Sequence, residues 1–198
     1  MNLPNKLTIL RIILVPIMVI VPYLNIQGNI LGIPITCIAI DAIFIIASIT
    51  DKLDGTIARK KNLVTKFGKF LDPIADKILV LAALIILVEL NKAPAWIPII
   101  VLFREFIVSG YRLIASQNSG QVIAASIWGK IKTVTQMIAI IIAYIDVGSF
   151  FECFNGNLTG ISYLINLLGT IMMLISVFAT IVSGIDYLKG GKDLIKDK

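Results

Sequence analysis

The sequence contains no histidine, and its only two cysteines are Cys37 and Cys153. Zinc and most transition-metal sites draw on these two residue types. A metal site in this chain must therefore be built from oxygen ligands, which suit a hard cation such as Mg²⁺, Mn²⁺ or Ca²⁺. The two cysteines have no ligand-like spacing, and in so apolar a chain we expect packing residues, with a disulfide as the alternative.

Charged residues are also scarce. They make up 15% of the 198 residues, whereas 58% are hydrophobic, and the mean hydropathy is +0.94. An ordinary soluble domain has about a quarter of its residues charged. The composition therefore predicts an integral membrane protein. No small-residue cleavage site follows the first apolar stretch, so we expect that stretch to belong to the mature protein.

Long apolar runs define the expected fold. A helix needs about 20 apolar residues to cross a bilayer. Six stretches meet this requirement: 7–26, 33–53, 70–90, 95–115, 124–146 and 159–187. Segments rich in helix breakers, such as NIQGN, NKAPAW and SQNSGQ, separate neighbouring stretches. We predict an all-α integral membrane protein with six transmembrane helices, forming a single domain over residues 1–198.

The basic residues predict the orientation in the membrane. They gather near the N-terminus, in residues 52–69, at the start of the fifth span and in the C-terminal tail, whereas the alternate connections contain only Lys92. Positive charge marks the cytoplasmic side. We therefore expect both termini and the segment after the second span to be cytoplasmic. Lysines beside anionic lipid account for the net charge of +6, so no nucleic-acid partner is expected.

Four aspartates lie in the stretch DKLDGTIARKKNLVTKFGKFLDPIAD, residues 51–76. Asp51 and Asp54 are three residues apart, and Asp72 and Asp76 are four apart, so each pair shares a helix face. If the two helices are antiparallel neighbours, both faces can meet near the cytoplasmic surface. Carboxylates crowded in this way cannot all stay ionised without positive charge. The pattern therefore predicts one or two divalent cations.

Small residues and an arginine accompany the aspartates. Gly55, Ala58 and Gly68 leave room for a bulky group to approach the backbone. Arg59 can donate two parallel hydrogen bonds to a phosphate. Together with a metal, these features suit a diphosphate ligand and phosphoryl chemistry. A single aspartate at a helix end is usually solvated or a cap, but that alternative leaves the set of four unexplained. Asp41 receives no role.

The stretch fits the pattern D-x2-D-G-x2-A-R-x8-G-x3-D-x3-D at every fixed position. This pattern resembles the signature of the CDP-alcohol phosphotransferases. The resemblance implies a six-helix membrane enzyme, commonly a homodimer, that cleaves a CDP-linked substrate with divalent metal and releases CMP. The segments NLPNKLTILRIILVP, FREFIVSGYRL, GKIKT and SGIDYLKG extend the likeness over nearly the whole chain. Tyr111 is a mild departure, since a small apolar residue is expected there.

These segments are most similar to bacterial members that transfer a phosphatidyl group from CDP-diacylglycerol to sn-glycerol 3-phosphate. The resemblance implies two Mg²⁺ or Mn²⁺ ions and a bacterial cytoplasmic membrane. It also implies roles for individual residues. The metal ligands would be Asp51, Asp54, Asp72 and Asp76, with Asp76 also the catalytic base. Residues for CDP-diacylglycerol would be Gly55, Ala58, Arg59, Gly68, Asn5 and Thr8, with Arg11 beside them.

The acceptor is an anion and needs cations of its own. Arg104 and Arg112 in the fourth span, and Lys130 and Lys132 in the fifth, are the expected glycerol 3-phosphate ligands. Arg104 is the most informative, because an unpaired arginine inside an apolar run is costly. Its alternative role is a salt bridge to Glu105 or to an aspartate. The alternative for the two lysines is snorkelling towards the membrane surface.

Other functions stay open at this point. The aspartate motif handles the donor, so the acceptor could also be an inositol phosphate, serine or phosphatidylglycerol, although the basic residues favour an anion. A cation transporter would use Asp41, Asp72 and Asp76 as a relay, but the acids crowd near one predicted surface. A third possibility, a structural membrane adaptor, would not explain the four aspartates of the predicted metal site.

Overall fold

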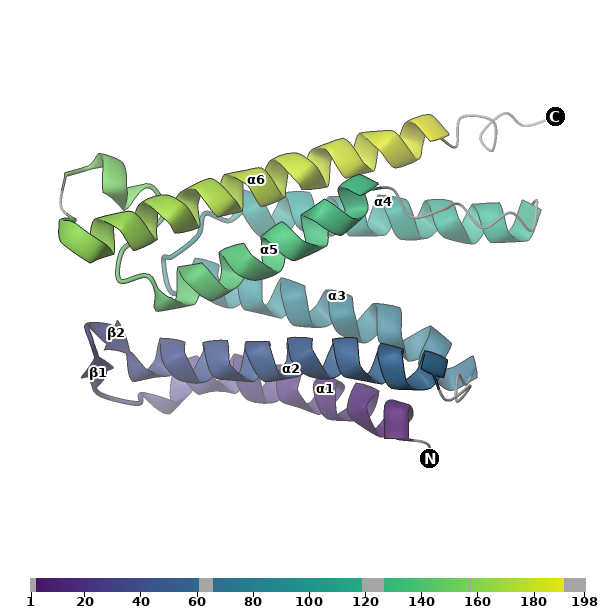
Figure 1. The fold of residues 1–198 in the computed structure, drawn as a ribbon, viewed down its shortest axis with the longest axis horizontal. Coiled ribbons are helices and arrows are strands. Elements are labelled where there is room, and N and C mark those ends of the chain that lie inside the picture. The colour runs from purple at the N-terminus through teal and green to yellow at the C-terminus, as the bar shows by residue number, and fades with distance from the viewer. Residues whose placement is uncertain (1–2, 61–65, 119–126, 157, 191–198) are drawn as a thin grey trace.

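The computed structural model describes residues 3–60, 66–118, 127–156 and 158–190. Within these ranges the chain forms six helices, as predicted (Figure 1). They are α1 (Leu3–Ile20), α2 (Ile35–Lys60), α3 (Lys66–Glu89), α4 (Trp96–Asn118), α5 (Ile127–Ile145) and α6 (Gly160–Gly190). Short 3₁₀ turns follow α1 at Val21–Leu24 and precede α6 at Glu152–Phe154. The predicted apolar stretches therefore correspond to the helices one by one.

One small β-hairpin departs from the all-helical prediction. Strands β1 (Asn29–Ile30) and β2 (Ile33–Pro34) pair antiparallel between α1 and α2. Leu31 and Gly32 form the connection, with φ angles of 54° and 84°. Two successive positive φ angles are what a tight two-residue hairpin turn requires. Apolar runs of bilayer length do not predict this element, because each of its strands has only two residues.

Two helical segments are long and apolar enough to cross a membrane by composition, Lys6–Leu24 and Gly160–Lys189. The other described helices include charged residues such as Asp51, Asp76, Arg104 and Lys132, which count against a span in such a test. These are the residues that the sequence singles out for chemistry. The charged residues that lower the hydropathy of these helices are therefore also candidate site residues.

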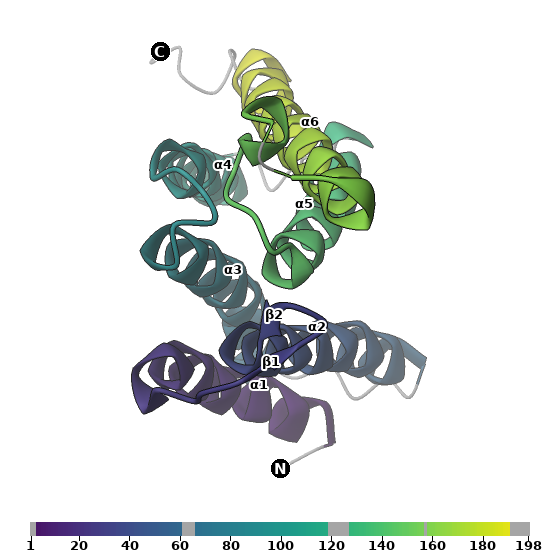
Figure 2. The same cartoon turned by 90° about the vertical axis from the view of Figure 1, so that its left-hand side faces the viewer.

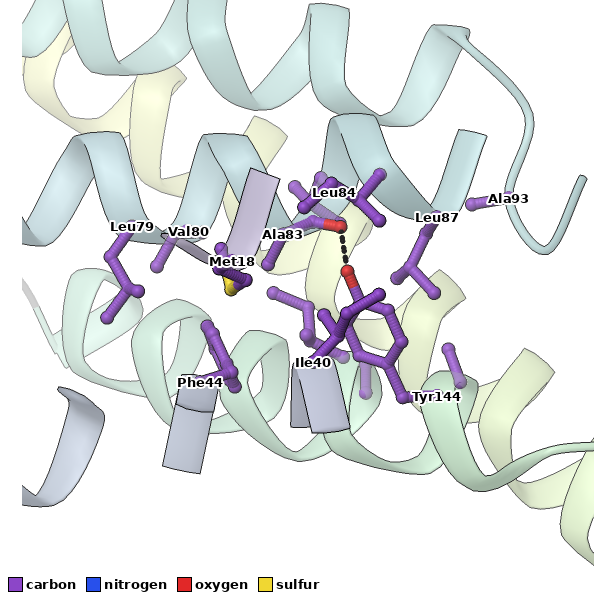
Figure 3. Close-up of a cluster of buried hydrophobic side chains, with 14 of the residues drawn as sticks. Met18, Ile40, Phe44, Leu79, Val80, Ala83, Leu84, Leu87, Ala93 and Tyr144 are labelled. Atoms are coloured by element: carbon purple, nitrogen blue, oxygen red, sulfur yellow. Dashed lines mark hydrogen bonds between the residues drawn. The ribbon is translucent and has the colours of Figure 1, made fainter. Parts of the chain in front are cut away.

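The helices pack around a buried apolar core. Helix α1 packs on α2 and α3, whereas α5 lies along α6, and α4 contacts both α3 and α6 (Figures 1 and 2). Met18, Phe44 and Leu84 are among the core side chains from different helices (Figure 3). The Tyr144 hydroxyl donates to the carbonyl of Ala83 at 2.7 Å. This bond joins α5 to α3 and satisfies a polar group that burial would otherwise penalise.

The start of α1, the end of α2, the start of α3 and the end of α6 lie at the same end of the bundle (Figure 1). The end of α4 and the start of α5 point towards this end too, as the alternation of basic connections predicts. The hairpin and the connections α3–α4 and α5–α6 occupy the opposite end. Cys37 and Cys153 are both free and buried, so the packing interpretation of the cysteines is confirmed.

Candidate functional site

The aspartate motif lies on two helices, as predicted. Helix α2 continues beyond its apolar run to Lys60, and α3 begins again at Lys66 and runs antiparallel to it (Figure 1). Asp51 comes from α2 and lies within electrostatic range of Asp72 and Asp76 of α3. Of the four motif aspartates, the structure thus places Asp51 near both Asp72 and Asp76. Gly68 is buried at the start of α3.

For several residues predicted to bind the donor or the metal, the structure describes the helix position but not the side chain. They are Asn5, Asp54, Gly55, Ala58 and Arg59. Their positions on α1 and α2 follow from the helix bounds alone. Their assignment to CDP-diacylglycerol or to metal therefore stays a prediction.

Helix α1 supplies direct partners to two of the aspartates. The Thr8 hydroxyl donates to Asp72 Oδ1 at 2.7 Å. Arg11 Nη1 forms an ion pair with Asp51 Oδ1 at 2.6 Å, and the Arg11 side chain is fully buried. Thr8 and Arg11 are three residues apart, so they share one face of α1. This face positions one aspartate of α2 and one of α3, which places Thr8 and Arg11 at the site.

The donor chemistry of the aspartates fits a hard divalent cation, because all the candidate ligands are carboxylate oxygens. Within residues whose side chains the structure describes, no group of three acids is gathered closely enough to hold a metal ion. Asp54 falls outside that set, and the Asp51 carboxylate is engaged by Arg11. The four-aspartate metal site therefore stays a prediction that the residue types support.

A second polar cluster centres on Glu105 of α4. Arg104 Nη1 lies 2.7 Å from Glu105 Oε1, and Lys132 Nζ of α5 lies 2.8 Å from the same oxygen. Lys77 Nζ of α3 lies 3.6 Å from Glu105 Oε2. Three helices therefore contribute a cation to one carboxylate. We call these four side chains, Lys77, Arg104, Glu105 and Lys132, the Glu105 cluster.

Arg104 is held on its other sides by α6. Its Nη2 donates to Ser183 Oγ at 2.5 Å, and its guanidinium carbon lies 5.7 Å from the ring centroid of Tyr187. At Gly184 a Cβ atom would lie 3.4 Å from Arg104 Cγ. An arginine stacked on an aromatic ring keeps its planar donors oriented. The arginine is therefore fixed in one geometry by neighbours on α4 and α6.

The structure separates the predicted acceptor residues. Arg104 takes the salt bridge to Glu105 that the sequence offered as its alternative role. Lys132 is buried against Glu105, so it does not snorkel, whereas Lys130 is exposed. The side chain of Arg112 lies outside the described part. Of the four predicted acceptor ligands, the structure brings Arg104 and Lys132 together.

Sequence reasoning missed the central place of Glu105 and the contribution of Lys77. Both carried a usable signal, because each is a charged residue inside an apolar helix and directly follows a predicted site residue. Lys77 also donates to Ser109 of α4, which ties α3 to α4 at this layer. Asp76 lies within electrostatic range of Lys132 and Glu105. The aspartate group and the Glu105 cluster are therefore neighbours.

This geometry agrees with a comparison to known sequences. A sequence model of the CDP-alcohol phosphatidyltransferase family matches residues 1–182. The chain belongs to this family. As a CDP-alcohol phosphatidyltransferase it is a membrane-embedded transferase. The family match includes residues 51–76, whose aspartate pattern resembles the family signature.

Curated relatives of this CDP-alcohol phosphatidyltransferase align over nearly its whole length. It is 42% identical to the CDP-diacylglycerol–glycerol-3-phosphate 3-phosphatidyltransferase of Bacillus subtilis, with 98% of this chain and 97% of the relative covered. The Rickettsia felis protein of the same name is 38% identical, with 96% of each chain covered. A probable phosphatidylglycerophosphate synthase of Mycobacterium tuberculosis is 35% identical, over 94% of this chain and 80% of the relative.

Proposed function

We propose that the protein transfers the phosphatidyl group of CDP-diacylglycerol to sn-glycerol 3-phosphate, which yields phosphatidylglycerophosphate and CMP. The observation that carries the proposal is the placement of the aspartate group beside a partly buried cluster of cations. The names of the relatives from Bacillus subtilis and Rickettsia felis describe the same donor and the same acceptor.

The donor side of the reaction belongs to α1, α2 and α3. Asp51, Asp54, Asp72 and Asp76 would hold two Mg²⁺ or Mn²⁺ ions, which when bound would neutralise the diphosphate and stabilise the leaving CMP. Thr8 positions Asp72 by a hydrogen bond, and Arg11 positions Asp51 by an ion pair. Gly55, Ala58 and Gly68 would leave space for the cytidylyl group, and Arg59 and Asn5 would contact the donor.

The chemical step is an in-line displacement at the phosphorus that carries diacylglycerol. Asp76 accepts the proton of the glycerol hydroxyl as this oxygen bonds to phosphorus. The bond from phosphorus to the bridging oxygen of the diphosphate breaks, and its electron pair leaves with CMP. Asp76 suits this role because it is within electrostatic range both of Asp51 and of Glu105 and Lys132 in the Glu105 cluster.

The acceptor phosphate would bind to Arg104 and Lys132, with Arg112 and Lys130 from the same two helices. Arg104 and Lys132 are already oriented at one point by their shared carboxylate. Such preorganised donors are worth more in a partly dry site than in water. A zwitterionic acceptor such as serine has no net charge and would leave the surplus positive charge of the cluster unneutralised, so the phosphate-bearing acceptor is favoured.

Location and assembly complete the proposal. The enzyme would lie in a bacterial cytoplasmic membrane as a homodimer, with both termini and the aspartates on the cytoplasmic side. The basic connections favour this orientation by the positive-inside rule. The start of α1, the end of α2 and the end of α6 lie at one end of the bundle, which supports this orientation (Figure 1).

A CMP-release assay tests the function. Purified protein in detergent micelles with CDP-diacylglycerol and Mg²⁺ should release CMP on addition of glycerol 3-phosphate, and much more slowly with serine, inositol phosphate or phosphatidylglycerol. Fast release with a different alcohol and none with glycerol 3-phosphate would reject the proposed acceptor. The absence of CMP release with every alcohol would reject the transferase itself.

A further inference from the structure

The Glu105 cluster has more positive charge than its one carboxylate can neutralise. Lys77, Arg104 and Lys132 all contact Glu105, so the four side chains together carry a net charge of +2 when ionised. The side chains of Arg104 and Lys132 are 11% and 8% exposed, whereas that of Lys77 is 32% exposed, so the surplus away from water is that of Arg104 and Lys132. Positive charge held this far from water is costly unless an anion accompanies it.

Arg104 also has a hydrogen-bond donor that no described residue accepts from. Arg104 Nη1 faces Glu105 and Nη2 donates to Ser183. Its third nitrogen, Nε, is buried without a hydrogen-bond partner among the described residues. A buried guanidinium with an unused donor is suited to a ligand that brings oxygen acceptors and negative charge.

One further charged side chain of α3 lies near this cluster. Asp76 is within electrostatic range of Lys132 and Glu105. In the proposed reaction, however, Asp76 serves the metal ions and the acceptor hydroxyl, so its charge is not available to the cluster. A phosphate monoester carries about −1.5 to −2 at neutral pH. This charge matches the surplus of the cluster.

We propose that Glu105 is the positioning residue of the acceptor site, because its carboxylate holds Arg104 and Lys132 together as an anion-binding pair whose surplus charge selects a phosphate monoester. The inference rests on the proposed function and deepens it. Without the carboxylate, three like charges would repel one another in a medium of low dielectric constant. Glu105 therefore keeps the pair assembled before the acceptor arrives, and it touches the acceptor only through that pair.

The test is a kinetic comparison of Glu105→Gln, Glu105→Asp and the wild type. Glu105→Gln keeps the shape but removes the charge, and the KM for glycerol 3-phosphate should rise roughly tenfold, the effect of losing about one hydrogen bond to a charged group. The kcat and the KM for CDP-diacylglycerol should change less than about twofold, because uniform acceptor binding is what is lost. Glu105→Asp keeps the charge and should recover part of the loss. Glu89→Gln, a charge removal at the exposed far end of α3, is the matched control and should change nothing.

A double-mutant cycle with Lys132→Gln separates positioning from general packing. If Glu105 acts through Lys132, the double variant should raise the KM for glycerol 3-phosphate by clearly less than the product of the two single effects. Multiplicative effects, or a Glu105→Gln variant whose KM for glycerol 3-phosphate equals that of the wild type, would overturn the proposal. So would an equal rise in the KM of both substrates.

The same measurements distinguish a failure of this inference from a failure of the proposed function on which it rests. Wild-type CMP release with glycerol 3-phosphate tests the function, and only the variants test Glu105. Should Glu105→Gln fail to give folded protein, Glu105→Asp carries the test. A rise confined to the KM of glycerol 3-phosphate then supports the proposal, and a fall confined to kcat overturns it.

Discussion

Arg11 of α1 and Asp51 of α2 form an ion pair at 2.6 Å in which the guanidinium is fully buried and the carboxylate side chain is 34% exposed. Three residues before Arg11, Thr8 bonds to Asp72 of α3. One face of α1 thus holds two aspartates that come from different helices. Asp51 is paired with a charged group, whereas Asp72 accepts a hydrogen bond from a neutral hydroxyl. Loss of the carboxylate charge should therefore affect stability at Asp51 but not at Asp72.

Replacement of either aspartate by asparagine should abolish turnover, but only Asp51→Asn should also lower stability. Asp51→Asn removes the charge opposite the buried Arg11, at an expected cost of about 1–3 kcal/mol, below that of a fully buried pair because Asp51 is partly exposed. Asp72→Asn keeps an oxygen that can accept from Thr8, so its unfolding midpoint should stay near that of the wild type. CMP release and thermal unfolding in detergent check both statements.

Asp54→Asn is the comparison variant within the same motif, and it should lose activity as the other two do. Near-normal CMP release at saturating Mg²⁺ in any of these variants would remove that residue from the ligand set. An Asp51→Asn variant as stable as the wild type would show that the pair with Arg11 contributes little to the fold.

Asp76→Asn should retain the apparent affinity for CDP-diacylglycerol but lose most of the rate. A general base typically contributes ~10²–10⁴-fold, and asparagine cannot take the proton of the acceptor hydroxyl. Steady-state kinetics with varied donor concentration measure both constants. A variant whose donor KM rises steeply, and falls again when Mg²⁺ is added in excess, would instead mark Asp76 as mainly a metal ligand.

Removal of divalent cations should stop the reaction reversibly. The expected metal site consists of carboxylates, so Mg²⁺ or Mn²⁺ should restore CMP release after treatment with a chelator, since both accept oxygen ligands. Zn²⁺, which usually takes nitrogen or sulfur ligands in proteins, should restore less. Full activity after exhaustive chelation would refute the metal assignment, and unchanged thermal unfolding of the chelated protein would show that the loss is chemical rather than structural.

The sequence predicted the helices well because apolar runs of bilayer length leave few alternatives to a helix. Helix α2 extends past its apolar run to Lys60, which the spacing of Asp51, Asp54 and Ala58 on one face had required. The basic residues alone also predicted that the start of α1, the end of α2 and the end of α6 share one end of the bundle. Helix positions and the grouping of helix ends could be predicted because they depend on residues that are close together in the sequence.

Contacts between distant residues were harder to predict. Thr8 and Asp72 are 64 residues apart, and Lys132 and Glu105 are 27 apart. Their pairing depends on how the helices rotate against one another, which a period of 3.6 residues does not specify. The sequence could name Glu105 as a possible partner of Arg104, but not that cations from α3 and α5 converge on the same carboxylate. The β-hairpin was missed because its strands have two residues each.

The acceptor assignment depends most on Arg104. Arg104→Lys keeps one positive charge but cannot reach Glu105 Oε1 and Ser183 Oγ at once, because it lacks the planar fork that makes both contacts. A hydrogen bond to a charged group is worth roughly 1.5–3 kcal/mol, so kcat/KM for glycerol 3-phosphate should fall by about one to two decades. The KM for CDP-diacylglycerol should stay nearly constant, and Arg112→Lys should behave in the same way.

Ser183→Ala is the matched control, because it removes only the α6 partner of Arg104 and leaves the guanidinium and Glu105 in place. Its effect on kcat/KM should be smaller than that of Arg104→Lys, since Glu105 and the Tyr187 ring still orient the arginine. If Ser183→Ala and Arg104→Lys reduced activity equally and raised the KM of both substrates, Arg104 would serve the packing of α4 on α6. The acceptor phosphate would then have to bind elsewhere, with Arg112 and Lys130 as the remaining predicted ligands.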